Sequence, residues 1–194
     1  MKTLFLMVIG YLLGSISTGV LLVRKLRPGL DLTKVGSGNI GATNVGRVLG
    51  AKWGIVTMVG DCVKGYLPVL LAVEWSMPPV TVAITALSAF LGHIYPLYLR
   101  LKGGKGVATA LGVWLAISPS TALIAFIIWS GAVIISRSTA VGALSSAIAL
   151  PIIVVSTISI GRGVYFLLAL IISCMVFYTH RSNIRIIIEG KTTH

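Results

Sequence analysis

Long apolar runs, separated by short polar segments, constrain this chain more than any other feature of its sequence. A helix needs about 20 apolar residues to cross the hydrocarbon core of a bilayer, where every backbone group must find its hydrogen-bond partner within the protein. The runs predict an all-α, polytopic integral membrane protein with a single transmembrane domain over residues 1–194. They are Leu4–Val23, Trp53–Val73, Val80–Leu99, Val107–Ile135, Ala140–Ile160 and Gly163–Tyr178.

The fourth run, Val107–Ile135, is too long for one simple span. As a single helix it would extend over about 43 Å, whereas the hydrocarbon core is about 30 Å thick. Pro119 lies inside this run between two serines, and a proline can end one helix and begin the next. We therefore expect about seven transmembrane helices, of which the half before Pro119 is short and starts deep in the membrane.

The cations are distributed unevenly among the polar segments. The chain has 16 Lys and Arg against 4 Asp and Glu, a net charge of +12. With seven spans, 13 of the 16 cations fall on one side of the membrane, whereas six spans would leave Arg137 and the cations of the tail outside. The positive-inside rule therefore favours seven spans, with the N-terminus out and the C-terminus in the cytoplasm. The segments on the cytoplasmic side are then 24–52, 100–106, 137–138 and 181–194.

The composition also excludes several classes of protein. Only 10% of the residues are charged, whereas soluble domains are nearer a quarter. Basic patches interleaved with aromatic residues are absent, so the positive charge suits anionic lipids or phosphate substrates and not nucleic acid. Cys62 and Cys174 lie in apolar runs and are expected to be reduced packing residues. No metal-ligand spacing is present, and we expect no metal and no other cofactor.

The segment before Val107 combines cations with glycines and predicts an anion site. Glycine leaves the backbone N–H groups open to a closely approaching ligand, and a helix beginning at Val107 would add its dipole. Gly106 stands where a Walker motif has the Ser or Thr that binds magnesium, which argues against nucleotide hydrolysis. We therefore expect this loop to hold phosphate at a membrane face. Its cations are Arg100, Lys102 and Lys105, and its glycines are Gly103, Gly104 and Gly106.

The segment Val35–Arg47 is the second candidate for phosphate binding. Its Gly-x-Gly-x-x-Gly pattern is not a dinucleotide fingerprint, because no strand precedes it and no βαβ unit fits. The pattern still offers backbone amides, polar side chains and the bidentate guanidinium of Arg47. The alternative is a flexible polar connector. The predicted contacts of this segment are Ser37, Gly38, Asn39, Gly41, Asn44 and Arg47, with Thr43 as a further polar group.

Three other polar features lie within or next to the apolar runs. Asp61 and Lys64 are three residues apart on a helix, so they are either a structural ion pair or a pair that orders the site. His93, near the end of the third run, is either a structural donor or a general base. In the tail, His180 and Asn183 share a helical face. The alternative there is an interfacial anchor for anionic headgroups.

These polar segments together resemble the bacterial acyl-phosphate-dependent glycerol-3-phosphate acyltransferases of the inner membrane. The resemblance rests on Gly-Ser-Gly-Asn-Ile-Gly-Ala-Thr-Asn (36–44), on Gly-His-Ile-Tyr-Pro (92–96) followed by Lys-Gly-Gly-Lys-Gly-Val-Ala-Thr (102–109), and on the His-Arg-x-Asn-Ile tail (180–184). It implies a multi-pass protein of the bacterial cell (inner) membrane that transfers a fatty acyl group from acyl phosphate to glycerol 3-phosphate on the cytoplasmic side. The products would be lysophosphatidate and inorganic phosphate, and no obligate protein partner is implied. The family's substrate-contacting positions map onto Ser37, Arg47, Lys105, His180 and Asn183.

One departure from the family pattern concerns the start of the fifth run. Many members have a Ser-Leu pair followed by a small residue, where this chain has Ala140-Val141-Gly142. The serine contact expected there is missing unless a neighbouring hydroxyl replaces it. The candidates are Ser138, Thr139 and Ser145.

The chemistry of an acyl phosphate agrees with these residues. The mixed anhydride is already activated, so the enzyme chiefly has to neutralise phosphate charge and position its substrates, for which we expect Lys105 and Arg47. His180 or Asn183 would orient the attacking hydroxyl, and its proton would pass to His180, to His93 or to a substrate phosphate oxygen. An acyl-enzyme on Ser37 is an alternative route. A small transporter or flippase for phosphorylated solutes is the alternative function, although its binding groups would be expected near the midplane.

The predicted site residues therefore fall into two overlapping sets. The catalytic set is Lys105, His180, Asn183 and Ser37. The substrate- and phosphate-binding set is Ser37, Gly38, Asn39, Gly41, Asn44, Arg47, His93, Lys102, Gly103, Gly104, Lys105, His180 and Asn183.

Overall fold

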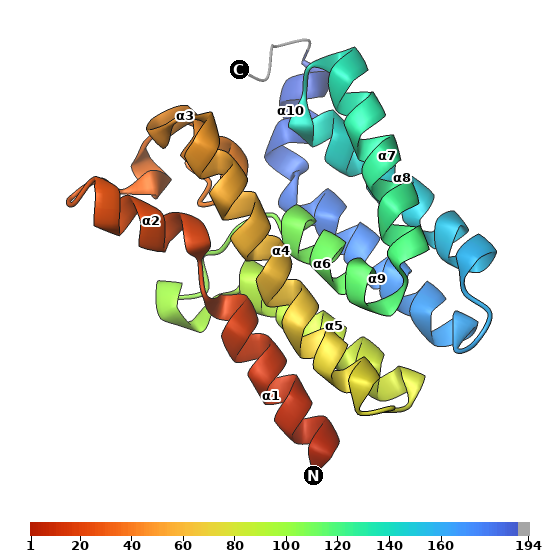
Figure 1. Cartoon of the computed structure of the whole chain (residues 1–194). Coiled ribbons are helices and arrows are strands. Elements are labelled where there is room, and N and C mark those ends of the chain that lie inside the picture. The colour runs from red at the N-terminus through yellow and green to blue at the C-terminus, as the bar shows by residue number, and fades with distance from the viewer. Residues whose placement is uncertain (190–194) are drawn as a thin grey trace. The chain divides into compact units, whose positions relative to one another are not determined.

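The computed structural model describes residues 1–189, and all of its regular elements are helices in that range (Figure 1). It divides into two compact units, Met1–Ile117 and Ser118–His194, which are described separately. The single domain predicted over residues 1–194 stays a prediction. The α-helices are α1 (Lys2–Ser15), α2 (Thr18–Leu26), α3 (Ala42–Leu49), α4 (Ala51–Glu74), α5 (Pro79–Ile94), α6 (Val107–Ile117), α7 (Pro119–Ser136), α8 (Thr139–Thr157), α9 (Arg162–Thr179) and α10 (Arg181–Ile188), and the 3-10 helices are η1 (Leu32–Lys34) and η2 (Leu97–Leu99).

The lengths and apolar composition of the helices confirm the all-α, multi-pass prediction. Within residues 1–189, six segments are long and apolar enough to cross a membrane, and Val107–Ile117 is a shorter apolar helix. The helix is interrupted at Ser118, whose side chain accepts a hydrogen bond from Thr121 N, and Pro119 occupies the first turn of the next helix. The expected division of the fourth run is therefore confirmed. At 1.5 Å per residue, α6 reaches roughly halfway through a hydrocarbon core.

The first apolar run contains a break that the sequence analysis did not predict. The run Leu4–Val23 was expected to form one helix, but α1 ends at Ser15 and α2 begins at Thr18. Ile16 is extended, and the Ser17 hydroxyl accepts a hydrogen bond from Val20 N at 3.4 Å, which caps α2. Serine favours a helix start for this reason, whereas the hydropathy of the run is continuous across the break.

Glycines bring the helices of the first unit into close contact. A Cβ atom added at Gly14 of α1 would overlap the carbonyl of Ala89 on α5, and one added at Gly112 of α6 would overlap the carbonyl of Cys62 on α4. Small residues of this kind let membrane helices approach until their backbones touch. The pairs α1–α5 and α4–α6 are packed in this way.

The segment that begins after the break in the first span is a folded cap and not a flexible connector. We define the cap as Thr18–Gly50, which comprises α2, η1 and α3. It has a small apolar core, and α3 packs against α4. Leu99 of η2 packs against the same core, so the segment before Val107 is joined to the cap. The buried residues of the core are Val23, Leu32, Ile40 and Val45.

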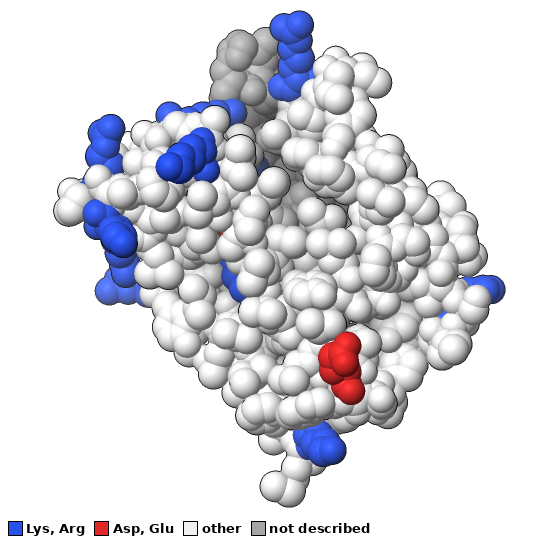
Figure 2. Space-filling view, viewed as in Figure 1, with Lys and Arg blue, Asp and Glu red and all other residues white. Residues whose placement is uncertain are grey.

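The two ends of the first unit have different chemistry. At the end with the N-terminus, Phe5 stacks on Trp75 with ring centroids 6.1 Å apart, and Lys2 Nζ lies 5.9 Å from the Trp75 ring. The cap lies at the other end of the unit (Figure 1). Figure 2 shows Lys and Arg side chains gathered over α2 and α3. The polar segments 24–52 and 100–106 therefore share one end of the first unit, as the charge pattern predicts.

The second unit is a series of antiparallel helices. Thr121 near the start of α7 and Thr157 at the end of α8 share a hydrogen bond of 2.6 Å between their hydroxyl groups. Ser173 of α9 donates to the carbonyl of Ala147 on α8 at 2.7 Å. This register places the end of α9 beside the start of α8, so His180 and the α7–α8 turn at Arg137 lie at the same end of the second unit.

Candidate active site

Asn44 holds the glycine-rich segment of the cap in one conformation. Its side chain is 1% exposed. Its Oδ1 atom accepts from Ser37 N at 2.9 Å, and its Nδ2 atom donates to three backbone carbonyls at 2.8–3.2 Å. The sequence analysis predicted a phosphate contact for Asn44. Its polar atoms are instead bonded to the cap backbone, so we assign it a positioning role. The three carbonyls belong to Leu32, Val35 and Asn39.

The exposed groups of the cap are arranged around this asparagine. Ser37 is exposed and sits in the turn held by Asn44, where Gly36 and Gly38 have φ angles of +59° and +68°. Such angles favour glycine, and a Cβ atom added at Gly36 would also overlap Asn44 Oδ1. Arg47 is exposed in the last turn of α3, three residues after Asn44. One buried side chain thereby fixes the backbone that presents both Ser37 and Arg47.

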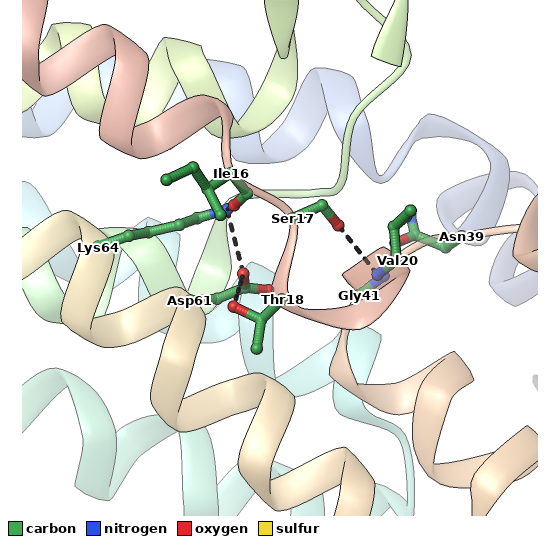
Figure 3. A network of polar contacts seen from close by, with 8 residues as sticks. All are labelled: Ile16, Ser17, Thr18, Val20, Asn39, Gly41, Asp61 and Lys64. Carbon is green, nitrogen blue, oxygen red and sulfur yellow. Dashed lines mark hydrogen bonds and ion pairs between the residues drawn. The ribbon is translucent and has the colours of Figure 1, made fainter. Parts of the chain in front are cut away.

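Asn39 and Gly41 shape the start of α3. The Asn39 Oδ1 atom accepts from Gly41 N at 2.8 Å, a local turn that leads into the helix (Figure 3). The carbonyl of Gly41 accepts from the amides of Asn44 and Val45, which begins the helical hydrogen bonds. The Gly41 amide is therefore used within the cap.

The glycines of the lysine-containing loop pack against the end of α5. Gly104 N donates to the carbonyl of His93 at 3.1 Å, and Gly103 N donates to the carbonyl of Ile94 at 3.0 Å. A Cβ atom added at Gly104 would overlap the His93 ring, and one added at Gly103 would overlap both carbonyls. The prediction that these two amides face a phosphate is therefore corrected, because the structure uses them to fasten the loop. Lys102 is exposed on the same loop.

His93 supports this loop from beneath. The side chain is buried, and its Nδ1 atom has no hydrogen-bond partner among the described residues. Its ring lies under Gly104, and its carbonyl accepts the Gly104 amide. We assign His93 to the support of the loop, in place of the substrate contact that the sequence analysis predicted.

Lys105 and Arg47 act on each other although they come from separate motifs. Lys105 is half-buried at the entry to α6. Burial lowers the pKa of Lys105 below its ordinary value, and the positive charge of Arg47 lowers this pKa further. An anion placed between two cations lowers their electrostatic repulsion and is attracted by both. Leu99, before Lys105, and Val48, beside Arg47, pack on the same core of the cap, so the two cations lie at the same end of the first unit.

In the second unit, His180 lies where α9 ends and α10 begins. The side chain is buried, and its Nδ1 atom lies 2.9 Å from the carbonyl oxygen of Val176. A carbonyl can only accept, so a neutral ring carries its proton on Nδ1 and keeps Nε2 as an acceptor. Asn183 is half-buried in the first turn of α10. Both residues lie at the end of the unit that also carries Arg137.

The neighbouring cations of the tail have partners of their own. The Arg181 guanidinium lies 4.5 Å from the Tyr178 ring and donates to the Tyr178 carbonyl. Arg185 Nε lies 2.8 Å from a carboxylate oxygen of Glu189, and the Arg185 side chain is exposed. These contacts of Arg181 and Arg185 suit a helix at a membrane surface, which is the interfacial alternative for the tail.

The hydroxyl groups considered as replacements for the missing serine lie at different depths. Ser138 is the buried cap residue of α8, and Thr139 is the first residue of that helix. Ser145 lies further along α8. The antiparallel register places Ser138 and Thr139 at the end of the unit where His180 lies, so these two are the better candidates. Among residues 1–189, no three His, Cys, Asp or Glu side chains are grouped as metal ligands would be.

Comparison with known proteins identifies the family. The sequence model of the family described as glycerol-3-phosphate acyltransferase matches residues 4–190. This chain belongs to that family. A relative from Geotalea daltonii named glycerol-3-phosphate acyltransferase is 46% identical over 98% of this chain and 96% of its own. One of the same name from Aquifex aeolicus is 41% identical over 98% of both chains. The resemblance stated from the motifs is confirmed.

Solved structures of this acyltransferase family have the same fold. The crystal structure of PlsY (YgiH), an integral membrane glycerol 3-phosphate acyltransferase, in its glycerol 3-phosphate form matches with a TM-score of 0.93 and 37% identity. The match covers 100% of this chain and 96% of that one. Its lysophosphatidic acid form matches with a TM-score of 0.91 and 36% identity, over 100% and 95% of the two chains.

Proposed function

We propose that this protein transfers a fatty acyl group from acyl phosphate to glycerol 3-phosphate and releases lysophosphatidate and inorganic phosphate. Membership of the acyltransferase family supports the acyl transfer and its acceptor. The observation that carries the proposal is that the two cation-bearing motifs share one end of the first unit, because Leu99, before Lys105, and Val48, beside Arg47, pack on the same cap core. Both proposed substrates carry a phosphate group that such a pair would attract.

The reaction needs little covalent chemistry from the protein. The hydroxyl oxygen of glycerol 3-phosphate attacks the acyl carbon, a new C–O ester bond forms, and the bond from the acyl carbon to the phosphate oxygen breaks. The proton of the attacking hydroxyl ends on the released phosphate, so charge and atoms balance. Phosphate is a good leaving group, and catalysis therefore consists chiefly of positioning and charge stabilisation.

Lys105 and Arg47 neutralise the phosphate groups and align the two substrates. Arg47 offers a bidentate fork for phosphate oxygens, and Lys105 a compact positive charge. Ser37 donates a hydrogen bond from its exposed hydroxyl. An acyl-enzyme on Ser37 is not supported, because no His or carboxylate among the described residues is hydrogen-bonded to that hydroxyl.

His180 and Asn183 orient the attacking hydroxyl. The Nδ1–H···O=C bond to Val176 fixes the tautomer in which His180 Nε2 accepts the hydroxyl proton. From His180 the proton passes to the departing phosphate. In the alternative route the hydroxyl gives its proton directly to the phosphate. His93 is the weaker choice of base, since its ring lies buried beneath Gly104.

The protein is a multi-pass membrane protein, and we place it in the bacterial inner membrane with its active site in the cytoplasm. In this orientation the N-terminus lies outside and the C-terminus inside. The positive-inside rule supports the assignment, because the cations of the first unit gather at the cap end (Figure 2). The end opposite the cap carries Trp75, an aromatic residue typical of a membrane interface.

Phosphate release by the purified protein in detergent tests the proposal. We expect phosphate release from acyl phosphate that depends on glycerol 3-phosphate, and much slower formation of the common product, lysophosphatidate, when acyl-CoA or acyl-(acyl carrier protein) is the donor. A transporter or flippase would release no phosphate in the absence of two compartments. Faster formation of lysophosphatidate with acyl-CoA than with acyl phosphate would refute the assignment of the donor but not that of the acceptor.

A further inference from the structure

A buried polar network crosses the middle of the first unit and is not used by the proposed chemistry. Asp61 and Lys64 of α4 are 3% and 7% exposed, and Lys64 Nζ lies 3.0 Å from Asp61 Oδ1. Lys64 Nζ also donates to the carbonyl of Ile16 at 2.6 Å, and the Thr18 hydroxyl donates to Asp61 Oδ1 at 3.2 Å (Figure 3). The two charges are therefore bonded to the break in the first span as well as to each other.

The break needs the ammonium group of Lys64. Ile16 is extended, so its carbonyl leaves the helical hydrogen-bond ladder inside a segment that spans the membrane. A backbone carbonyl without a donor is costly there, because no water is at hand to replace the missing bond. An ion pair that only balanced its own charges would not have to contact this carbonyl.

Each residue of the break is tied to a different part of the unit. The Ser15 hydroxyl accepts from Leu97 N at 3.3 Å, which fastens the segment leading to Lys105. Ile16 and Thr18 are bonded to α4, and Ser17 caps α2, the first helix of the cap that carries Arg47. The break is therefore a second point, besides the packing of Leu99 on the cap core, at which the two phosphate-binding segments are joined.

We propose that Lys64 is a positioning residue for acyl transfer, which acts by holding the carbonyl of Ile16 and so sets the spacing between Arg47 and Lys105. Asp61 is its counter-charge and also holds Thr18. The proposal rests on the proposed function, because Arg47 and Lys105 are the phosphate-binding pair.

Two uncharged double variants separate positioning from charge balance. In Asp61→Asn with Lys64→Gln, residue 64 can still donate to the Ile16 carbonyl, whereas in Asp61→Asn with Lys64→Met it cannot. Both keep a side-chain oxygen at position 61 that accepts from Thr18, and both leave no unpaired charge in the span. We expect similar unfolding temperatures for both, a KM for glycerol 3-phosphate within about threefold of the wild type for the Gln variant, and a rise of at least tenfold for the Met variant.

A second measurement reports on the spacing between Arg47 and Lys105 and does not depend on turnover. The rate at which an amine-reactive reagent modifies Lys105, followed by mass spectrometry over a range of pH, reports the pKa of this residue. In the Met variant Arg47 should move away, and the pKa of Lys105 should rise by the smaller part of its shift, because burial, the larger cause, remains. In the Gln variant it should stay at the wild-type value. A wild-type protein that releases no phosphate would refute the proposed function, while the Lys105 profiles would still test the positioning role.

The proposal fails if the Met variant retains both the wild-type KM and the wild-type Lys105 profile. It also fails if the Gln variant folds but shows the full tenfold rise in KM, because the charge and not the carbonyl contact would then be what matters. Should the Met variant not fold, the Gln variant alone decides: a wild-type KM supports the proposal and a tenfold rise overturns it.

Discussion

Replacement of Asn44 by Asp exchanges the side-chain NH2 group for an oxygen and keeps the shape of the side chain that holds the cap backbone. The carboxylate can still accept from Ser37 N, but it cannot donate to the carbonyls of Leu32, Val35 and Asn39. The amide NH2 shares its two hydrogens among these three carbonyls, and the loss of a donor to buried acceptors costs about 1.5 kcal/mol per hydrogen, so the ordered loop is destabilised by about 3 kcal/mol. Because about 1.4 kcal/mol is a factor of ten, the ordered population falls by up to about a hundredfold.

The consequence for activity is a rise in the KM for glycerol 3-phosphate. For a ligand that binds only the ordered loop, the apparent Kd equals the intrinsic Kd divided by the fraction of molecules in which the loop is ordered. We therefore expect kcat/KM to fall by between about tenfold and a hundredfold in the phosphate-release assay. Thr33→Val is the matched control, because it removes an exposed hydrogen bond to Asp31 in the same cap and should change kcat/KM by less than about twofold.

Wild-type kinetics in Asn44→Asp would refute the reasoning. Either the loop would then keep its conformation without the three donated bonds, or it would take no part in binding. Unfolding temperatures distinguish the two: an unchanged temperature indicates the first, and a lower temperature with unchanged kinetics indicates the second.

Three further predictions concern the loop that contains Lys105. Lys105→Ala should abolish phosphate release without lowering the unfolding temperature by more than a few degrees, and wild-type turnover in this variant would exclude Lys105 from the mechanism. If protonated Lys105 is required, phosphate release should decline with rising pH at values below the 10.5 of an ordinary lysine, because burial and Arg47 lower the pKa of this residue. The unfolded chain binds this proton more tightly than the folded chain, so the free energy of unfolding should increase over the same pH range. A decline in phosphate release only above pH 10.5 would contradict the geometry. Gly104→Ala should destabilise the loop and reduce activity at least tenfold, because the new methyl group would overlap the His93 ring, whereas Gly131→Ala, where the space is open, should be neutral in both assays.

Hydropathy and charge were enough to predict the membrane architecture. The span boundaries, the division at Pro119 and the sharing of one end by segments 24–52 and 100–106 all follow from residue type and spacing. The break at Ile16 and Ser17 could not be predicted in this way, because it depends on Lys64, a residue 48 positions away along the chain. A long-range contact of this kind leaves no periodic signal in the local sequence.

For the candidate site, the sequence supplied a set of residues, and the structure gives several of them a supporting role. Arg47 and Lys105 were assigned to one phosphate site, and in the structure both lie at the cap end of the first unit, where the charge of Arg47 adds to burial in lowering the pKa of Lys105. The glycines at 103 and 104 were taken as sites of ligand approach, but the same lack of a side chain also permits the close packing on His93 and Ile94 that the structure shows. Asn44 has the polarity of a ligand contact in the sequence, and only its burial assigns it to the support of the loop.

The central claim is that the three polar segments act on one side of the membrane. It is tested most directly by thiol labelling of single cysteines placed at Lys34, Lys102, Ser182 and Ser76 in a chain with Cys62→Ala and Cys174→Ala. The four positions are exposed. With a membrane-impermeant maleimide, the account predicts that only the cysteine at 76 is labelled in intact spheroplasts and that those at 34, 102 and 182 are labelled in inside-out vesicles. Labelling at position 182 from outside, with 34 and 102 protected, would contradict the account.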